Sequence, residues 1–270
     1  MDRLHRKYDI LKEDLISMKS AAVAFSGGVD STFLLKAAHD VLGENVTAIT
    51  VRSPLFPARE TGGSASFCSR EGIKQIIIDV DSLKIPGFKD NPPDRCYICK
   101  RELFIRMKDE AAKLGTTNVL EGSNTDDEGD YRPGRAAVKE LGVKSPLLDA
   151  GLSKGEIRAL SKELGLETWR KPSFACLASR FVYGETITRE KLLKIEEAET
   201  FLFERGFTQV RVRMHNDTAR IEIDPSEFDK ILSRDTAKNI DAFFKSLGFI
   251  YVTLDLGGYK TGSMNKTIGI

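Results

Sequence analysis

Residues 26–31 read Ser-Gly-Gly-Val-Asp-Ser, which joins two adjacent glycines to two hydroxyls and a carboxylate. An apolar run over 21–25 predicts a short buried strand before it, and the apolar spacing over 32–42 predicts a helix that ends at Gly43. Two glycines let backbone N–H groups face an anion without a Cβ in the way, and the helix adds the positive end of its dipole. This pattern predicts a phosphate cradle. It lacks the lysine of a Walker loop and the third glycine of a dinucleotide fingerprint.

The four cysteines are a second source of chemistry: Cys68, Cys96, Cys99 and Cys176. In a reducing compartment they are expected to be metal ligands, redox groups or nucleophiles. Cys96 and Cys99 stand at the start of a predicted helix, where residues three apart share a face. A Cys-x-x-Cys pair alone leaves zinc, a redox disulfide and an iron–sulfur cluster open. We expect Cys68 to be a bystander, because its neighbours look like an ordinary helix face.

Polar side chains follow the predicted strand 118–122. Asn124, Asp126 and Asp127 carry oxygens that could hold Mg²⁺ or a ribose. Arg132 and Arg135 add guanidinium groups suited to a phosphate or a carboxylate. A plain loop rich in turn formers has the same composition and is the alternative.

The run 210–215 alternates strictly, so that Arg211, Arg213 and His215 share one face of a predicted strand. Arg220 and Glu222 share a face of the next strand. Two guanidiniums at i and i+2 suit a phosphate or carboxylate ligand. A solvated sheet face with cross-strand ion pairs is the alternative.

These groups are carried by alternating strands and helices. Such alternation predicts an α/β fold with a doubly wound parallel sheet over residues 1–178, in which ligands bind at the carboxyl ends of the strands. The order helix, strand, strand, helix, strand predicts a smaller α+β domain over 179–270. The expected strands are 21–25, 46–51, 74–80, 118–122, 144–148, 207–215, 219–224 and 250–254, and the expected helices are 4–18, 32–42, 57–72, 95–114, 153–164, 188–205 and 225–247.

Composition narrows the classes of function. A chain of 270 residues with 41% hydrophobic content can bury one large core or two smaller ones. A net charge of +1 argues against general binding to nucleic acid or to membranes. No apolar run approaches the ~20 residues of a membrane span, and no signal peptide opens the sequence, so we expect a cytoplasmic protein.

The Ser-Gly-Gly-x-Asp-Ser stretch resembles the PP-loop of the ATP pyrophosphatases, which split ATP into AMP and pyrophosphate. The likeness becomes specific with the loop 130–134, with Cys176 before Ser179 and Arg180, with the block 210–222, and with the ending 251–265. Together these resemble the LarE family over nearly the whole chain. That resemblance implies an ATP-dependent sulfur transferase of nickel-pincer nucleotide biosynthesis. Its substrate would be pyridinium-3,5-biscarboxylic acid mononucleotide, whose carboxylates are adenylylated and then converted to thiocarboxylates.

The resemblance also implies roles for residues. One version of the family sacrifices the sulfur of the cysteine that matches Cys176; the other binds a 4Fe-4S cluster through three cysteines, which match Cys96, Cys99 and Cys176. This chain has all three, and the open iron of such a cluster would carry the sulfide. Catalytic roles are expected for Cys176 and Asp30. ATP and Mg²⁺ are expected at Ala24, Ser26, Gly28, Asp30, Ser31, Gly122 and Asp126, and the substrate and its phosphate at Ser179, Arg180, Glu199, Arg211, Arg213 and Glu222.

Two other functions stay open. A PP-loop tRNA thiolase also pairs this loop with a three-cysteine cluster, but it needs an RNA-binding surface that a net charge of +1 does little to provide. A non-catalytic nucleotide sensor would use ATP only to order the two domains. The resemblance further implies a homo-oligomer and a sulfide or cysteine-derived sulfur donor.

Overall fold

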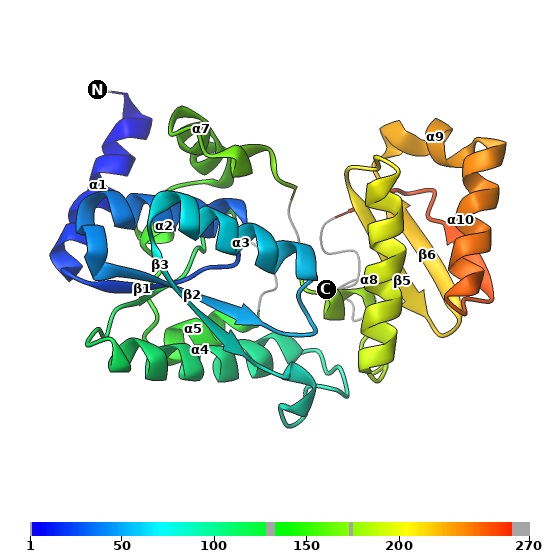
Figure 1. Cartoon of the computed structure of the whole chain (residues 1–270), viewed down its shortest axis with the longest axis horizontal. Coiled ribbons are helices and arrows are strands. Elements are labelled where there is room, and N and C mark those ends of the chain that lie inside the picture. The colour runs from blue at the N-terminus through cyan, green and yellow to red at the C-terminus, as the bar shows by residue number, and fades with distance from the viewer. Residues whose placement is uncertain (1, 128–132, 173–174, 261–270) are drawn as a thin grey trace. The chain divides into compact units, whose positions relative to one another are not determined.

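The computed structural model describes residues 2–127, 133–172 and 175–260. The chain forms two compact units (Figure 1): unit 1 comprises Met1–Ile85 with Asp94–Phe174, and unit 2 comprises Pro86–Pro93 with Ala175–Ile270. The short segment 86–93 therefore leaves unit 1 and joins a unit that is otherwise built more than 80 residues later. The assignment of an ATP-binding domain to 1–178 and a substrate-binding domain to 179–270 stays a prediction.

Unit 1 is built on a four-stranded sheet in the order β3-β2-β1-β4, and every neighbouring pair is parallel. The chain runs outward from β1 through β2 to β3 and then returns to place β4 on the other side of β1. Loops after β1 and β4 therefore leave the sheet in opposite directions, which creates a crevice at their carboxyl ends. The strands are β1 (Ala21–Ala24), β2 (Val46–Arg52), β3 (Lys74–Asp79) and β4 (Val119–Leu120).

Helices cover both faces of this sheet, which confirms the doubly wound α/β fold (Figure 1). The helices α2 and α3 lie on one face, and α4 and α5 lie on the other. The bounds are α1 (Arg3–Met18), α2 (Val29–Leu42), α3 (Ala58–Glu71), α4 (Arg95–Lys113), α5 (Gly134–Glu140), α6 (Pro146–Asp149) and α7 (Lys154–Glu163).

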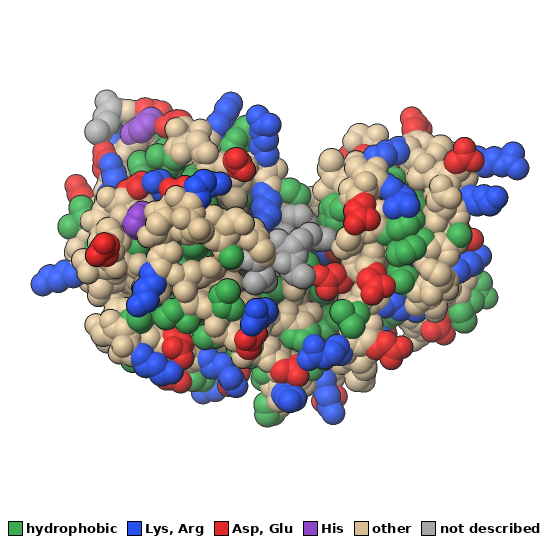
Figure 2. Space-filling model, in the orientation of Figure 1, with side chains coloured by type: hydrophobic (Ala, Val, Ile, Leu, Met, Phe, Trp, Pro, Cys, Tyr) green, Lys and Arg blue, Asp and Glu red, His purple; other side chains and the backbone are tan. Residues whose placement is uncertain are grey.

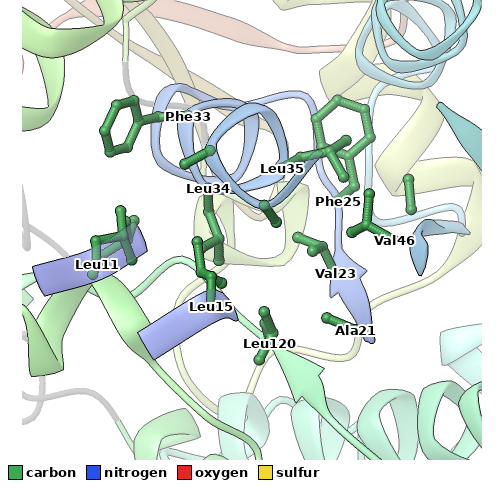
Figure 3. Packing of buried hydrophobic residues seen from close by; sticks show 14 of the residues in the cluster. Leu11, Leu15, Ala21, Val23, Phe25, Phe33, Leu34, Leu35, Val46 and Leu120 are labelled. Carbon is green, nitrogen blue, oxygen red and sulfur yellow. The ribbon is translucent and has the colours of Figure 1, made fainter. Parts of the chain in front are cut away.

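The core of unit 1 surrounds the strand and the helix that flank residues 26–31. In Figure 3, Leu11 and Leu15 of α1 lie near Leu34 of α2, and Val23 of β1 lies beneath the same helix. All four side chains are fully buried. Each such burial stabilises the fold by roughly 1.5–3 kcal/mol. The turn between β1 and α2 is thus held at both of its ends by packed apolar residues.

Three elements of unit 1 differ from the sequence predictions, and one of them is helix α5, for which no helix was expected. The predicted strand 144–148 is wrong: Lys144 forms only an isolated bridge with Leu120, and the chain then turns into α6. Pro146 explains the change, because proline has no N–H for a sheet ladder but fits the first turn of a helix. Helix α2 begins at Val29 and not at residue 32, so Asp30 and Ser31 belong to its first turn. The helix expected over 153–164 is confirmed as α7, which begins with a capping box formed by Ser153 and Glu156.

Unit 2 has the predicted order of elements. A three-stranded sheet, β5-β6-β7, pairs β5 with β6 antiparallel and β6 with β7 parallel, and α8 packs against β5. Stacked and edge-on phenylalanines join α8 to the helix before β7, as between Phe201 and Phe243. The elements are α8 (Arg189–Glu204), β5 (Val210–His215), β6 (Thr218–Ile223), α9 (Phe228–Leu232), α10 (Arg234–Ser246) and β7 (Tyr251–Leu254).

The segment 86–93 is anchored in unit 2 by Asn91. This residue is fully buried, has a left-handed backbone with φ of 52°, and donates from its amide to the Val182 carbonyl at 2.6 Å. Its own carbonyl accepts from the Gly184 amide at 2.9 Å. Asparagine tolerates this backbone conformation better than most residues. The Lys89 carbonyl also accepts from the Ile187 amide at 2.8 Å, so Lys89 and Asn91 both anchor the segment within unit 2.

The surface carries charges of both signs. Lys and Arg side chains are interspersed with Asp and Glu on the face that Figure 2 shows. Among the residues that the structure describes, none of the helices is both long and apolar enough to cross a membrane.

Candidate functional site

The turn over 26–31 has the geometry of an anion cradle. Gly27 takes a left-handed conformation with φ of 72°, which favours glycine, and Gly28 is the N-cap residue of α2. The Ser26 and Ser31 hydroxyl oxygens lie 3.0 Å apart, and the Ser26 amide donates to the Ser31 hydroxyl at 3.3 Å. These contacts close the turn on itself, while the first N–H groups of α2 have no acceptor within the helix. Ala24, the last residue of β1, leads directly into this turn.

Asp30 is held by two side chains from later parts of the chain. The Lys154 ammonium forms a short ion pair with its Oδ2, and the Asn124 side-chain amide donates to its Oδ1 at 3.4 Å. Asp30 and Lys154 are partly exposed, at 22% and 27% of their side-chain surfaces. The carboxylate is therefore both oriented and accessible.

The loop after β4 closes this site from the other side of the crevice. A Cβ atom on Gly122 would lie 3.1 Å from the Ser31 amide nitrogen and 3.2 Å from the Asp30 Cβ, so only glycine fits without displacing the turn. The Asp126 carboxylate accepts from the Lys154 backbone N–H at 3.3 Å, and Asp127 accepts from the Asn124 N–H at 3.0 Å. Of the predicted ATP-site residues, Ser26, Gly28, Asp30, Ser31, Gly122 and Asp126 thus come together at one edge of the sheet.

A second lysine also reaches the turn. Lys171 donates from its ammonium group to the Gly27 carbonyl at 3.0 Å. The Arg158 guanidinium fixes the backbone before it by donating to the carbonyls of Trp169 and Lys171. Sequence reasoning missed both Lys154 and Lys171, since each lies over 120 residues from the turn. Only their place after the fourth strand could have drawn attention to them.

Arg135, which the sequence placed near a phosphate, instead donates from its Nη1 to the Asp127 carbonyl at 3.0 Å. Gly134 packs against α4: a Cβ there would lie 2.7 Å from Lys100 Cδ and 3.3 Å from the Cys96 carbonyl oxygen. Arg132 and the ending 261–265 lie outside the described residues, so their predicted roles stay predictions.

None of the four cysteines forms a disulfide, and their exposure differs. Cys96 is exposed and Cys99 is buried, and both lie in the first turns of α4. Cys68 is 2% exposed within the core of unit 1, and this burial raises its pKa to about 11. A thiol that stays neutral in an apolar core is a poor metal ligand, which agrees with the bystander role.

Cys176 is partly exposed and belongs to unit 2, whereas Cys96 and Cys99 belong to unit 1. Within 2–127, 133–172 and 175–260, no three side chains of His, Cys, Asp or Glu are grouped as metal ligands. The chemistry of the donor set nevertheless fits a cluster, since Cys96, Cys99 and Cys176 lie outside the apolar cluster that contains Cys68.

Arg180 organises the backbone around Cys176. It is fully buried and donates from Nη1 to the carbonyls of Ala175 and Cys176, at 2.8 and 3.1 Å, and to the Ser179 hydroxyl at 2.9 Å. Its other two nitrogens donate to the two carboxylate oxygens of Glu199, each at 2.8 Å. Although burial alone would raise the pKa of Glu199, the charge and hydrogen bonds of Arg180 hold it below the ordinary value.

The arginines of β5 are buried rather than solvated. Arg211 is 2% exposed and Arg213 is 5% exposed, so the alternative of a solvated sheet face is wrong. Arg213 donates to the Ser179 carbonyl at 2.7 Å and to a Glu222 carboxylate oxygen at 2.8 Å. The expected cross-strand ion pair therefore exists, but it lies in the interior of unit 2.

The surroundings of Arg211 disfavour its positive charge. Burial, together with the positive charge of Arg180, lowers the pKa of the Arg211 guanidinium to about 10. Its guanidinium carbon lies 5.0 Å from the centre of the Tyr259 ring. Gly258 permits this arrangement, since its φ is 63° and a Cβ there would lie 2.8 Å from Pro225 Cγ. A buried cation with a lowered pKa favours an anionic partner.

Comparison with known proteins finds relatives over nearly the whole length of the chain. Pyridinium-3,5-bisthiocarboxylic acid mononucleotide synthase from Lactiplantibacillus plantarum is 41% identical over 269 residues, which covers 99% of this chain and 97% of that protein. An uncharacterised protein from Synechocystis is 41% identical over 265 residues, or 98% of this chain and 99% of that protein. One subunit of the glutamine-hydrolysing GMP synthase from Thermoplasma volcanium is 28% identical over 204 residues, or 70% of this chain and 64% of that protein. No protein-family model matches.

The parallel sheet and the cradle after its first strand define a PP-loop protein of the α/β class, and the GMP synthase likeness fits this class. Within it, the chain belongs to the LarE family of pyridinium-3,5-bisthiocarboxylic acid mononucleotide synthases, as its sequence predicted.

Proposed function

We propose that this protein is an ATP-dependent sulfur transferase that converts the carboxylates of pyridinium-3,5-biscarboxylic acid mononucleotide into thiocarboxylates. The observation that carries the proposal is the 41% identity, along 99% of this chain, to a protein named for the bisthiocarboxylic acid product. The cradle with Asp30 and the three cysteines outside the core supply the chemistry that such a product needs.

In the first step, a substrate carboxylate oxygen attacks the α-phosphorus of ATP and the bond to the bridging oxygen breaks. Its electron pair leaves with pyrophosphate. N–H groups of the turn and of the first turn of α2 would bind phosphate oxygens, and Ser26 and Ser31 would add hydroxyl donors. Asp30, Asn124 and Asp126 carry the oxygen ligands that Mg²⁺ prefers and lie beside this turn.

In the second step, a sulfur nucleophile adds to the activated acyl carbon, and AMP leaves with one oxygen of the former carboxylate. Adenylylation lowers this barrier because AMP is a far better leaving group than oxide. Hydrosulfide, carboxylate and ATP thus yield thiocarboxylate, AMP and pyrophosphate, and the proton of hydrosulfide ends on pyrophosphate. Arg211 and Arg213 would pair with the phosphate of the mononucleotide, as the lowered pKa of Arg211 favours an anion there.

We propose Cys96, Cys99 and Cys176 as the ligands of a 4Fe-4S cluster. When bound, this cluster supplies sulfur at the iron that the protein leaves unligated. The role of the chain is then to hold the three thiolates. Arg180 fixes the backbone of Cys176 within unit 2. Cys96 and Cys99 belong to helix α4, whose regular hydrogen bonds hold their backbone.

The test uses Cys96→Ser and Cys176→Ala, with Cys68→Ala as the matched control. Anaerobic reconstitution is expected to give roughly 4 iron and 4 acid-labile sulfide per chain for the unmodified protein and the control. Both ligand variants should lose the iron and the thiocarboxylate product. They should keep one round of ATP-dependent pyrophosphate release, because adenylylation needs no sulfur. Carboxylate labelled with ¹⁸O should transfer one label to AMP.

Other results would redirect the proposal. One bound zinc in protein purified without oxygen would overturn the cluster. Loss of one sulfur mass at Cys176 after turnover would show sacrificial transfer, and an intact Cys176 would show catalysis. Absence of pyrophosphate release with any carboxylate would favour the nucleotide sensor, and tight, salt-dependent tRNA binding would favour the thiolase.

A further inference from the structure

The PP-loop of this chain carries no cation of its own. Residues 26–31 contain one carboxylate and no lysine or arginine, although the ligand that the proposed function assigns to them is a polyanion. Backbone N–H groups alone contribute partial charges, and a leaving pyrophosphate gains negative charge as its bond breaks. Positive charge for this step can come from the Mg²⁺ that accompanies ATP and from side chains elsewhere in unit 1. Lys154 and Lys171 are the two ammonium groups that contact the loop among the described residues.

Lys154 is held in place from several sides. It is the first residue of α7, directly after the capping box of Ser153 and Glu156. The Lys7 ammonium donates to both carboxylate oxygens of Glu156, at 2.7 Å each, and so ties this helix start to α1. The Lys154 backbone N–H donates to Asp126 at 3.3 Å. With the backbone fixed, only the flexible side chain can choose between partners.

The Asp30–Lys154 pair is suited to exchange. Both side chains keep about a quarter of their surface in contact with solvent, at 22% and 27%. Partly exposed ion pairs contribute little free energy, so a stronger partner can replace either member. Mg²⁺ is a stronger partner for the carboxylate, and a phosphate oxygen is a suitable partner for the ammonium. Both arrive together in a magnesium nucleotide.

Lys171 has a different task. Its ammonium donates to the Gly27 carbonyl and so offsets the partial negative charge of this oxygen beside the proposed anion site. Its backbone is fixed by Arg158 of α7, which also holds Trp169. The same contact brings a positive charge to the glycine turn without placing a side chain inside it.

We propose that Lys154 and Lys171 together replace the missing loop cation, and that Lys154 moves from Asp30 to the β- and γ-phosphates when magnesium nucleotide binds. This inference rests on the proposed use of ATP. Lys154 is then the residue that stabilises the departing pyrophosphate, and in the empty site it keeps Asp30 in place by neutralising it.

The experiment is calorimetric titration of the full chain with α,β-methylene-ATP and with AMP, both in excess Mg²⁺. Lys154→Met should lower the affinity for α,β-methylene-ATP at least tenfold and the affinity for AMP less than threefold. AMP lacks the phosphates that Lys154 would contact. Lys154→Arg should recover part of the loss. Lys171→Met should lower the affinity for both nucleotides, because Lys171 supports the shape of the turn through the Gly27 carbonyl.

The matched control is Lys36→Met. Lys36 lies on α2, the helix that carries Asp30, and pairs with Asp40 while 21% exposed, so it resembles Lys154 in burial and pairing but lies away from the turn. Its loss should change neither affinity. Circular dichroism at 222 nm checks that each variant is folded.

A second readout tests the exchange itself. Without nucleotide, Lys154→Met should bind Mn²⁺ more tightly than the unmodified chain in an electron paramagnetic resonance titration, because a competing cation has left Asp30. Equal losses for AMP and α,β-methylene-ATP, or unchanged Mn²⁺ binding, would overturn the inference. If the unmodified chain binds no ATP analogue, the proposed function fails instead.

Discussion

Two charged pairs, one in each unit, lie in different surroundings. In unit 1, Asp30 and Lys154 stand partly in solvent at the edge of the sheet. In unit 2, Arg180 and Glu199 are fully buried. A partly exposed charge loses little free energy when it changes partner. A buried charge is strongly destabilising once its partner is removed.

This difference indicates different demands on the two sites. Under the proposed function, nucleotide and metal enter and leave unit 1, so its charged groups have to exchange partners. The network of unit 2 holds a backbone, since Arg180 connects the carbonyl of Cys176 to Glu199 on α8 and Glu199 accepts from the Val212 amide of β5 at 3.0 Å. A cysteine that delivers or binds sulfur gains from such rigidity, because small displacements at a reacting centre are costly.

The sharpest way to break the comparison is to remove one partner of the buried network. Glu199→Gln should destabilise unit 2 by about 3–5 kcal/mol, because it leaves the Arg180 guanidinium buried without its counter-charge. Urea unfolding followed by circular dichroism measures the loss, and hydrogen exchange of residues 207–223 locates it. Trp169, the one tryptophan of the chain, lies in unit 1, so its fluorescence follows the unfolding of that unit. This transition should be the same as in the unmodified chain.

Two variants complete this test. Arg180→Met combined with Glu199→Met should recover part of the loss, since the buried Arg180 charge is then removed together with its partner. Arg52→Met, which removes half of an exposed pair with Asp79, should leave the unfolding midpoint unchanged. Equal effects of Glu199→Gln and Arg52→Met would show that burial does not separate the two kinds of pair.

The turn in unit 1 should be sensitive to shape as well as to charge. Gly122→Ala places a methyl group 3.1 Å from the Ser31 amide and 3.2 Å from Asp30 Cβ, so the turn must move. We expect about a tenfold or larger loss of ATP affinity and of pyrophosphate release. Titration calorimetry and a pyrophosphate assay measure both.

Gly63→Ala is the control, since a Cβ there meets nothing within 4 Å. It lies in α3 and should stabilise the chain by about 0.5–1 kcal/mol with unchanged nucleotide affinity. Unaltered affinity in Gly122→Ala as well would mean that the approach of β4 to the turn has no role in binding.

Acid should weaken unit 2 through Glu199. Its folded pKa lies below the ordinary 4.5, so its stabilising contribution is complete above about pH 4.5 and is lost as pH falls through the folded pKa. The double Met variant lacks this carboxylate. Below pH 4.5 its unfolding free energy should therefore fall less steeply than that of the unmodified chain, by up to about 1.4 kcal/mol per pH unit. Parallel slopes would place the acid sensitivity elsewhere.

Local pattern was enough wherever neighbours in sequence are neighbours in space. The cradle over 26–31 follows from a strand, two glycines and a helix in succession, and the helix start at Ser153 follows from hydrogen bonds that span three residues. Local pattern was insufficient at 144–148. Lys144 forms one bridge to Leu120, and Pro146 then begins a helix where a strand was expected.

Burial was the main property that the pattern could not predict. Alternation placed Arg211 and Arg213 on one face of a strand correctly, but the face is covered, and nothing in six alternating residues reveals what covers it. The pairing of Arg180 with Glu199 depends on α8 packing against β5, a tertiary contact.

By itself, the sequence determined the class of this protein: a PP-loop in an α/β unit, followed by a second α+β unit. Only the tertiary structure decided which cations reach the loop, since Lys154 and Lys171 approach it from 124 and 144 residues away. Likewise, it alone decided that segment 86–93 belongs to unit 2. The physical reason is that local conformation depends on adjacent residues, whereas charge pairing and burial depend on how distant elements pack.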